Sequence, residues 1–354
     1  MQDVSNKIKN HINSKKLLRV SFLTQGDRQL ASSRFRVYQF LDIVEKECFQ
    51  SHILPLPPPE IKMRLMYLLS AFFASAKYDV TFVQKILFPK PYLLALRRVS
   101  GRLIYDWDDA LYTLPPRQII DPKKQFKRVE RLHLILRLAD TVICGNEVLA
   151  EYSAKYCADI RVIPTSIKIN QQLSSSCRDS EVVTIGWIGR AENLEYLERL
   201  EDVFDSLHDK YGTKVRLLVV CDKPLKSSTR LTIINKKWQL NDEETDITSF
   251  DIGIMPLEDT AWARGKCAFK LLQYMAFGVV CVGSPVGANK QVVKDAENGL
   301  LATTYKEWLN ALSRLIEDPT YRYKLAASAR STVEKIYSVS ANKKAFVGAV
   351  LGDI

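Results

Sequence analysis

The stretch ARGKCAFKLLQYMAFGVVCVGSPVG, residues 263–287, decides the fold class of this chain. It reads as a glycine-containing loop, a short helix that ends at Gly278, a buried strand and a second turn. Strands that alternate with helices in this way are typical of a parallel sheet with helices on both faces. We therefore expect an α/β protein.

The same alternation runs through two blocks of the chain. In the first block the predicted strands and helices are strands 17–24, 79–84, 102–107 and 140–145 and helices 34–49, 61–74 and 123–138. The polar segment 169–180 interrupts the pattern and predicts a linker. The second block contains predicted strands 181–189, 214–221, 250–257 and 279–287 and helices 193–212, 269–278 and about 306–337, with a last segment to about 351. Two α/β domains facing each other across a ligand-binding cleft are expected.

Composition is consistent with two such domains. The chain has 354 residues, of which 47% are hydrophobic and 26% charged, so each half can bury a core. Its seven cysteines form no CxxC pair, which fits a reducing compartment. No signal peptide is visible, and the apolar run Leu65–Ala76 is shorter than the ~20 residues of a membrane span. We expect a cytoplasmic protein. The apolar stretch Met63–Ala76, which contains this run, is one of two candidates for contact with a membrane, and burial in the core is the simpler expectation for it.

The net charge is distributed unevenly. Residues 1–166 hold 26 Lys and Arg against 16 Asp and Glu, whereas the remainder holds 25 against 24. The excess predicts an anionic partner for the first half, unless it is only a solvated basic face. The basic amphipathic stretch 123–134 favours an anionic membrane surface. Nucleic acid is not expected, because no recognition helix or aromatic platform is found.

Three cations surround the start of the helix predicted at 269–278. Arg264 and Lys266 precede it, and Lys270 lies four residues after Lys266, on the same face. A helix amino end suits phosphate, so these cations would neutralise a diphosphate. The alternative is a helix with solvated basic residues.

Three carboxylates, Asp106, Asp108 and Asp109, follow the strand predicted at 102–107. Their mutual repulsion predicts a raised pKa for one of them and a role in proton transfer. The alternative is that they cap the next loop and helix. Asp106-Trp107-Asp108 also matches a DxD pattern that binds a divalent cation in enzymes of another fold, one that lacks the second α/β domain. Mg²⁺ is therefore kept as an alternative, and no metal is expected.

Segments in both halves resemble glycosyltransferase family 4, enzymes of the GT-B fold, and occur in the order typical of that family. They are SSRFRVYQF (32–40), YDVTFVQK (78–85), LIYDWDDALY (103–112), VICGNEVLAEYS (142–153), VIPTSI (162–167), VVTIGWIGRAENLEYL (182–197), FDIGIMPLED (250–259), FKLLQYMAFGVVCVGSPVG (269–287) and NGLLATTYKEWLNALSRLIEDPTYRYKL (298–325). The resemblance implies two Rossmann-like domains: residues 1–168 on the acceptor side, joined by the returning C-terminal helix 338–354, and residues 169–337, which bind the nucleotide-sugar. It also implies transfer with retention and no required cofactor.

The resemblance further assigns candidate donor contacts. Gly189 and Arg190 take the place of a loop that contacts the diphosphate, but the usual lysine a few residues later is missing, and Lys266 and Lys270 are the candidates to replace its charge. The family usually has two glutamates in this segment, and at their positions this sequence has Gly265 and Gln273 instead. Gln273 can still hydrogen bond to ribose hydroxyls, without charge assistance, and Gly265 has only its backbone to offer the sugar.

On the acceptor side, Asp108 takes roughly the place of a histidine-containing turn, and Asp108 or its neighbours are expected to orient the acceptor hydroxyl or donor sugar. Arg34 is the candidate for a phosphate or acceptor contact; the alternative is a hydroxyl cap from Ser32 or Ser33 beside an exposed arginine. Trp238 is a candidate to pack beside a nucleobase; the alternative is an ordinary aromatic residue of the core or surface.

The sequence therefore predicts a glycosyltransferase that moves a sugar from a nucleotide diphosphate-sugar to a hydroxyl of a glycan or lipid-linked acceptor. The expected setting is cell-surface polysaccharide assembly, peripheral on the inner face of the membrane. The alternative is a catalytically degenerate nucleotide-binding or scaffold protein of the same fold, since both usual glutamates are absent.

Overall fold

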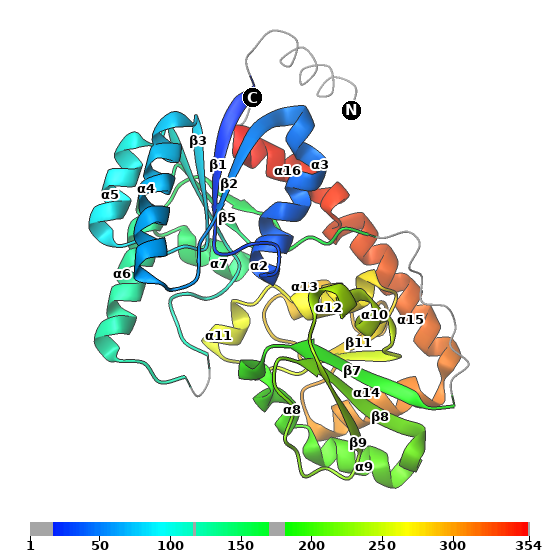
Figure 1. Ribbon diagram of the computed structural model, residues 1–354. Helices are drawn as coiled ribbons and strands as arrows, with labels where there is room; N and C mark the ends of the chain where they lie inside the picture. The colour runs from blue at the N-terminus through cyan, green and yellow to red at the C-terminus, as the bar shows by residue number, and fades with distance from the viewer. Residues whose placement is uncertain (1–16, 116–117, 170–180, 353–354) are drawn as a thin grey trace. The chain divides into compact units, whose positions relative to one another are not determined.

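The structure is a computed structural model that describes residues 17–115, 118–169 and 181–352 (Figure 1). It divides into two compact units. Of the described residues, the N-terminal unit contains 17–114, 118–166 and 342–352, and the C-terminal unit contains 115, 167–169 and 181–341.

The N-terminal unit is built on a six-stranded sheet in the order β2-β1-β3-β4-β5-β6, in which all neighbouring strands run parallel. The strands are β1 (Leu18–Thr24), β2 (Phe49–Pro55), β3 (Val80–Gln84), β4 (Arg102–Trp107), β5 (Thr141–Cys144) and β6 (Ile160–Val162). β3 and β5 are buried along their whole length, as expected of strands covered on both faces.

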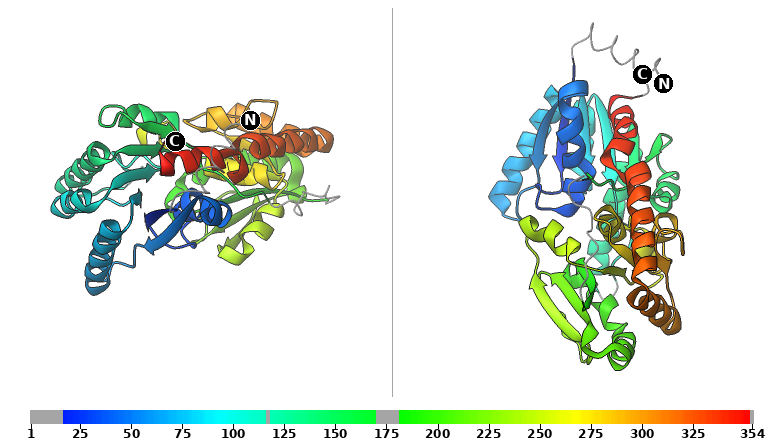
Figure 2. Two further views of the ribbon diagram at one scale, coloured as in Figure 1. Left: turned by 90° about the horizontal axis from the view of Figure 1, so that it is seen from above. Right: turned by 90° about the vertical axis from the view of Figure 1, so that its right-hand side faces the viewer.

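Helices cover both faces of this sheet. Helices α4 (Ile61–Lys77), α5 (Lys90–Val99) and α6 (Pro122–Leu138) lie next to one another in one layer (Figures 1 and 2). The other helices are α2 (Ala31–Ser33), the π-helix η1 (Arg34–Tyr38), α3 (Gln39–Cys48), α7 (Glu147–Ser153) and the C-terminal α16 (Val339–Leu351).

The C-terminal helix returns to the N-terminal unit, as the resemblance implied. Phe346 of α16 stacks on Phe40 of α3 with ring centroids 4.4 Å apart. The guanidinium of Arg102 donates to the carbonyl oxygen of Val350 at 3.1 Å. These contacts make the last helix part of the first core.

The C-terminal unit repeats the architecture with a second parallel sheet in the order β12-β11-β10-β7-β8-β9. Its strands are β7 (Val183–Gly189), β8 (Val215–Cys221), β9 (Thr232–Lys237), β10 (Ile252–Met255), β11 (Val280–Gly283) and β12 (Leu300–Leu301). Its helices are α8 (Glu195–Glu198), α9 (Glu201–Tyr211), α10 (Glu243–Thr248), α11 (Ala261–Arg264), α12 (Phe269–Ala276), α13 (Asn289–Val292), α14 (Tyr305–Glu317) and α15 (Pro319–Thr332), with short turns η2 (Ala191–Asn193), η3 (Gly212–Lys214), η4 (Leu240–Asp242) and η5 (Val333–Tyr337).

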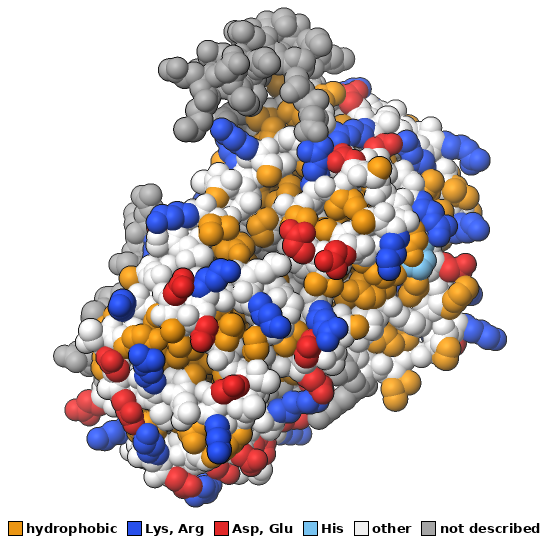
Figure 3. Space-filling model, turned by 180° about the vertical axis from the view of Figure 1, so that it is seen from behind, with side chains coloured by type: hydrophobic (Ala, Val, Ile, Leu, Met, Phe, Trp, Pro, Cys, Tyr) orange, Lys and Arg blue, Asp and Glu red, His pale blue; other side chains and the backbone are white. Residues whose placement is uncertain are grey.

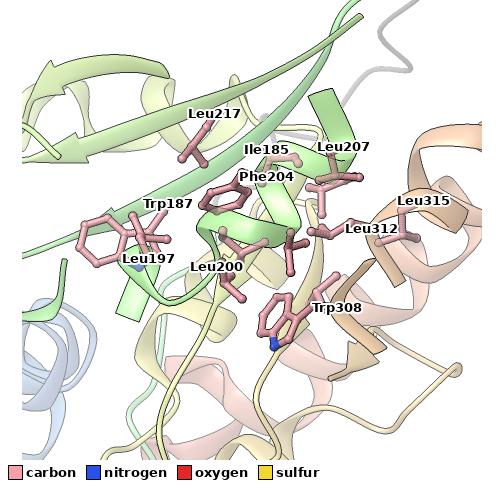
Figure 4. Packing of buried hydrophobic residues seen from close by; sticks show 14 of the residues in the cluster. Ile185, Trp187, Leu197, Leu200, Phe204, Leu207, Leu217, Trp308, Leu312 and Leu315 are labelled. Carbon is pink, nitrogen blue, oxygen red and sulfur yellow. The ribbon is translucent and has the colours of Figure 1, made fainter. Parts of the chain in front are cut away.

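The core of this unit lies between the sheet and helices α9 and α14 (Figure 4). Phe204 of α9 packs among Ile185 and Leu217 of the sheet, and Trp308 and Leu312 of α14 join the same cluster. All five side chains are at most 3% exposed.

The structure departs from the predicted elements at several ends. The first helix stops at Cys48, because Phe49 begins β2, and four short strands were missed: β2, β6, β9 and β12. The helix predicted at 193–212 breaks into α8 and α9, since Leu194, Leu197 and Leu200 all turn inward at a spacing of three, closer to a 3₁₀ turn than to an α-helix. The linker predicted at 169–180 lies almost wholly outside the described residues.

The apolar run Leu65–Ala76 was expected in the core, and this prediction is wrong. It forms α4, whose inner face is buried but whose outer face exposes Leu65, Met66, Leu69 and Phe73 by 54–66%. None of the helices in the described part of the chain has the length and apolar character needed to cross a bilayer.

We predict that Gly253→Ala lowers the free energy of unfolding by about 1–3 kcal/mol, because the added Cβ would lie 2.4 Å from Cδ2 of the buried Tyr274 ring. Gly348→Ala is the control: it lies in α16 with nothing within 4 Å of the added atom, and should stabilise by about 0.5–1 kcal/mol. Urea unfolding checks both values. Equal midpoints for the two variants would contradict the packing assigned to Tyr274.

Candidate functional site

In the N-terminal unit, polar side chains meet where β1, β3 and β4 end. Gln84 is the last residue of β3. Its side-chain oxygen accepts hydrogen bonds from the hydroxyl of Ser33 at 2.9 Å and from the backbone N–H of Gln25 at 2.9 Å. Its amide nitrogen donates to the hydroxyl of Ser32 at 2.9 Å, and that hydroxyl donates to Oδ2 of Asp108 at 2.7 Å. Ser32 and Ser33 therefore connect the strand ends; they do not cap the helix, whose N-cap is Leu30.

Lys85 carries the charge of this network. It follows β3 with a left-handed backbone, φ 58°, which a side-chain-bearing residue adopts at a cost. Its ammonium lies 2.8 Å from Oδ1 of Asp108 and also pairs with Asp109. The lysine side chain is 8% exposed, so this ion pair is shielded from water.

Asp106 is held by a second cation from the same unit. Arg36, in the π-helix η1, donates through Nε to Oδ2 of Asp106 at 3.2 Å and pairs with the other oxygen through Nη2. Its Nη1 donates to the carbonyl oxygen of Ile163 at 2.6 Å. The two side chains are 2% and 1% exposed, so Asp106 is an internal anchor that holds η1 to β4.

The repulsion expected among the three carboxylates is offset by the cations Arg36 and Lys85 beside them. Burial raises the pKa of Asp106, with Arg36 opposing it. Burial also favours neutral Asp108, but the charges of Lys85 and Arg36 outweigh it and its pKa lies below the ordinary value. The pKa of Lys85 lies above its ordinary value, since the two carboxylates outweigh burial. The raised pKa thus falls on an inaccessible carboxyl, and Asp108 is a hydrogen-bond acceptor.

Arg34 is a buried residue of the same unit. It is 9% exposed, its Nη1 donates to the carbonyl oxygen of Arg28 at 3.4 Å, and its guanidinium lies 4.7 Å from the ring centroid of Phe35. The exposed arginine of the alternative interpretation is therefore not observed.

In the C-terminal unit, Lys270 lies against the loop that follows β7. A Cβ on Gly189 would come within 2.7 Å of Cε of Lys270, so glycine makes room for the lysine there. The ammonium lies 5.3 Å from the ring centroid of Trp187. Gly189 and Lys270, singled out separately in the sequence, are in contact.

Lys266 reaches the same loop. Its Nζ donates to the side-chain oxygen of Asn193 at 3.3 Å and lies 5.2 Å from the ring centroid of Trp262. Asn193 begins the stretch in which the usual lysine is missing. The exposed Arg190 stands three residues earlier, directly after β7. Lys266, Lys270 and Arg190 thus belong to one edge of the sheet.

The third cation is engaged differently. Arg264 ends α11 and pairs with Asp259 through Nε at 2.6 Å and Nη2 at 3.0 Å. Gly265 caps the same helix with φ −80°, a conformation open to any residue. The next helix, α12, begins at Phe269. Its N-cap residue, Ala268, has a left-handed backbone (φ 53°), and its methyl group cannot accept a hydrogen bond from the helix.

Gln273 lies one turn into α12 and is buried against α10. Its Nε2 donates to Oε1 of Glu243 at 3.1 Å, and the indole nitrogen of Trp238 donates to Oε2 of the same carboxylate at 3.0 Å. A carboxylate thus lies beside the glutamine that replaces a glutamate of the family. Trp238 follows β9 at the same edge of the sheet.

Sequence reasoning missed several of these residues. Lys85 stands directly after a predicted strand, and that position was a usable signal. Glu243 and Asn193 gave none, because each becomes informative only beside Gln273 or Lys266. Within the described part of the chain, no three His, Cys, Asp or Glu side chains are grouped as metal ligands.

We predict that Arg36→Ala costs about 3–5 kcal/mol of the free energy of unfolding, because it leaves the buried carboxylate of Asp106 without its cation. The control Arg28→Ala removes a pair with Asp42 in which the arginine is 53% exposed, and should cost about 1 kcal/mol or less. Urea unfolding measures both. Similar losses would contradict the anchoring role of Arg36.

A second prediction concerns pH. A carboxyl whose folded pKa is lowered stabilises the fold above its unfolded pKa, about 3.9, and loses that contribution as pH falls through the folded value. Asp108→Asn should therefore be less stable than the parent at pH 6, and the difference should shrink below about pH 4. Thermal melting from pH 3 to 7 tests this; a difference that does not change with pH would contradict it.

Residues 182–318 match the family model of glycosyl transferases group 1, a span that contains Gly189, Arg190, Lys266, Lys270 and Gln273. No curated protein matches the chain.

Three solved structures have a similar fold. Sucrose-phosphate synthase (tll1590) from Thermosynechococcus elongatus is 14% identical with a TM-score of 0.68, covering 93% of this chain and 97% of its own. Anabaena Alr3699/HepE in complex with UDP and glucose is 13% identical, with a TM-score of 0.64 and coverage of 95% and 100%. The lipopolysaccharide outer core galactosyltransferase WaaB is 15% identical, with a TM-score of 0.61 and coverage of 95% and 100%. The chain therefore has the GT-B fold of these structures, and its segment 182–318 is similar to the glycosyl transferases group 1 family.

Proposed function

We propose that this protein transfers a sugar from a nucleotide diphosphate-sugar to a hydroxyl group of a glycan or lipid-linked acceptor, with retention of anomeric configuration. The observation that carries the proposal is the meeting of Gly189, Lys266 and Lys270 at one edge of the C-terminal sheet, inside the segment that matches the family. Ligands of open parallel sheets bind beyond the carboxyl ends of the strands, where these groups lie.

The diphosphate is assigned to the start of α12. A helix amino end favours anions, and Lys266 and Lys270 add two positive charges beside it. Lys266 lies near the ring of Trp262 and Lys270 near the ring of Trp187, and an indole ring attracts a cation over its face. Arg190 is proposed as a further contact from the loop after β7. Arg264 is the weaker candidate, since it already pairs with Asp259.

The nucleoside is assigned to the neighbouring group of Trp238, Glu243 and Gln273. Gln273 supplies an amide, and Glu243 supplies the carboxylate that position 273 has lost. Ribose hydroxyls are donors to both, and Trp238 offers an aromatic surface at the same edge. UDP is the first nucleotide to test, since the similar structure of HepE contains UDP.

In the proposed reaction, the acceptor oxygen bonds to the anomeric carbon while the bond from that carbon to the diphosphate breaks. The lysines stabilise the departing diphosphate, and the hydroxyl proton passes to it or to solvent. Asp108, with its lowered pKa, is proposed to orient the acceptor hydroxyl or the donor sugar, with Asp109 and Asp106 supporting it through Lys85 and Arg36. Arg34 is kept as a proposed acceptor or phosphate contact, and no metal is required.

The setting proposed is cell-surface polysaccharide assembly, in the cytoplasm at the inner face of the membrane. A second candidate is a nucleotide-binding or scaffold protein of the same fold. The observation that favours it is that Gly265 and Gln273 stand where two glutamates are usual. Binding of UDP, GDP or ADP without hydrolysis or transfer from any matching nucleotide-sugar would select this candidate.

We predict that Lys270→Ala weakens nucleotide diphosphate binding about 10- to 100-fold, the loss of one charge-assisted contact worth about 1.5–3 kcal/mol, and lowers transfer strongly. Lys214→Ala is the matched control, because this exposed lysine directly precedes β8 and so lies at the opposite edge of the sheet. Thermal shift with each nucleotide, with and without Mg²⁺, reports binding. Equal shifts for the Lys270 variant and its parent would refute the assignment.

A further inference from the structure

Helix α4 exposes a continuous apolar stripe. Its large exposed side chains are Ile61 (89%), Met63 (40%), Leu65 (60%), Met66 (60%), Leu69 (54%) and Phe73 (66%). Four of them recur every fourth residue and therefore line one side of the helix. Among the described residues, half of the twelve exposed large hydrophobics lie on this one helix, so the stripe is not a scatter of single exposed side chains.

The fold does not need this stripe. The opposite side of α4 supplies the packing contacts, through the buried residues Tyr67, Ala71, Ala74 and Ser75. Tyr92 of α5 ties the helix in place by donating to the carbonyl oxygen of Leu68 at 2.8 Å. The exposed stripe is thus presented outward by a helix that is already anchored.

The surroundings of the stripe are basic. Helix α4 carries Lys62, Arg64 and Lys77 and contains no Asp or Glu. In the same layer, a groove of about 530 Å³ between α5 and α6 is lined by Lys90, Phe126, Lys127, Glu130, Arg131 and Arg137, among others. Helices α4, α5 and α6 lie on the left in Figure 1 and therefore toward the right-hand edge of Figure 3, where Lys and Arg side chains gather.

We propose that the outer surface of α4, α5 and α6 docks on an anionic phospholipid bilayer. The stripe of α4 enters the boundary between headgroups and acyl chains, and the basic groove binds phosphate headgroups. A helix that is apolar on one side and has cations beside it lies in the plane of such an interface. With 17 residues, α4 is too short to span, and its anchored side holds it parallel to the surface.

A second copy of the chain fits this surface less well. Helices α4, α5 and α6 together hold 12 Lys and Arg against one acidic residue, Glu130, so two such faces would repel each other, whereas an anionic bilayer attracts this face. The inference deepens the membrane location given in the proposed function, and it does not require sugar transfer.

Co-sedimentation tests it with vesicles of phosphatidylcholine alone and of phosphatidylcholine with 30 mol% phosphatidylglycerol. The full chain should bind the anionic vesicles at least tenfold more strongly, and binding should fall as salt is raised from 50 to 500 mM. Leu65→Ser/Leu69→Ser/Phe73→Ser should lower binding at least tenfold. Lys127→Glu/Arg131→Glu should remove most of the preference for anionic vesicles.

The matched control is Ile234→Ser/Ile336→Ser, which removes exposed apolar side chains of the C-terminal unit (39% and 54%) and should leave vesicle binding unchanged. Thermal shift with UDP should be the same for every variant and its parent, so that loss of vesicle binding is separate from loss of the donor site. Vesicle binding that the triple variant retains would overturn the proposal. So would a parent chain that ignores vesicles but forms a dimer that the triple variant abolishes.

Discussion

The parallel direction of the strands is the constraint on which both candidate sites depend. Because each sheet is parallel, the carboxyl ends of its strands lie at one edge, where the following loops and helices begin. In the N-terminal unit this edge brings Gln84, Lys85 and Asp108 together from two neighbouring strands. In the C-terminal unit it places Gly189 beside Lys270.

The charged groups at the two edges have different surroundings. In the N-terminal unit the carboxylates are matched by cations of the same unit, Arg36 and Lys85, so that burial is tolerated and a rigid set of hydrogen-bond acceptors results. In the C-terminal unit, Lys266 lies near the Trp262 ring and donates to the side-chain oxygen of Asn193, and Lys270 lies near the Trp187 ring. An aromatic ring attracts a cation over its face and so helps to position these two lysines.

Much of the fold could be predicted, because a buried parallel strand is a short run of β-branched residues and the helices between such strands have clear ends. The missed strands lack this signal: β2 reads FQSHILP, β9 reads TIINKK with mostly exposed side chains, and β12 has only two residues. Pairing with a neighbouring strand, rather than their own composition, makes them part of the sheets. The prediction that α4 is buried in the core was wrong for the same reason. Apolar composition alone does not tell which side chains of a helix pack against a neighbouring element.

The sequence by itself determined the α/β class, the doubling of the architecture and the cations around the start of α12, because these follow from local periodicity and helix-end chemistry. Only the tertiary structure decided which charges meet. It paired Asp106 with Arg36, 70 residues away, and set Glu243 beside Gln273, 30 residues away. The pKa of a carboxyl depends on such neighbours and on burial, and both are properties of the folded chain.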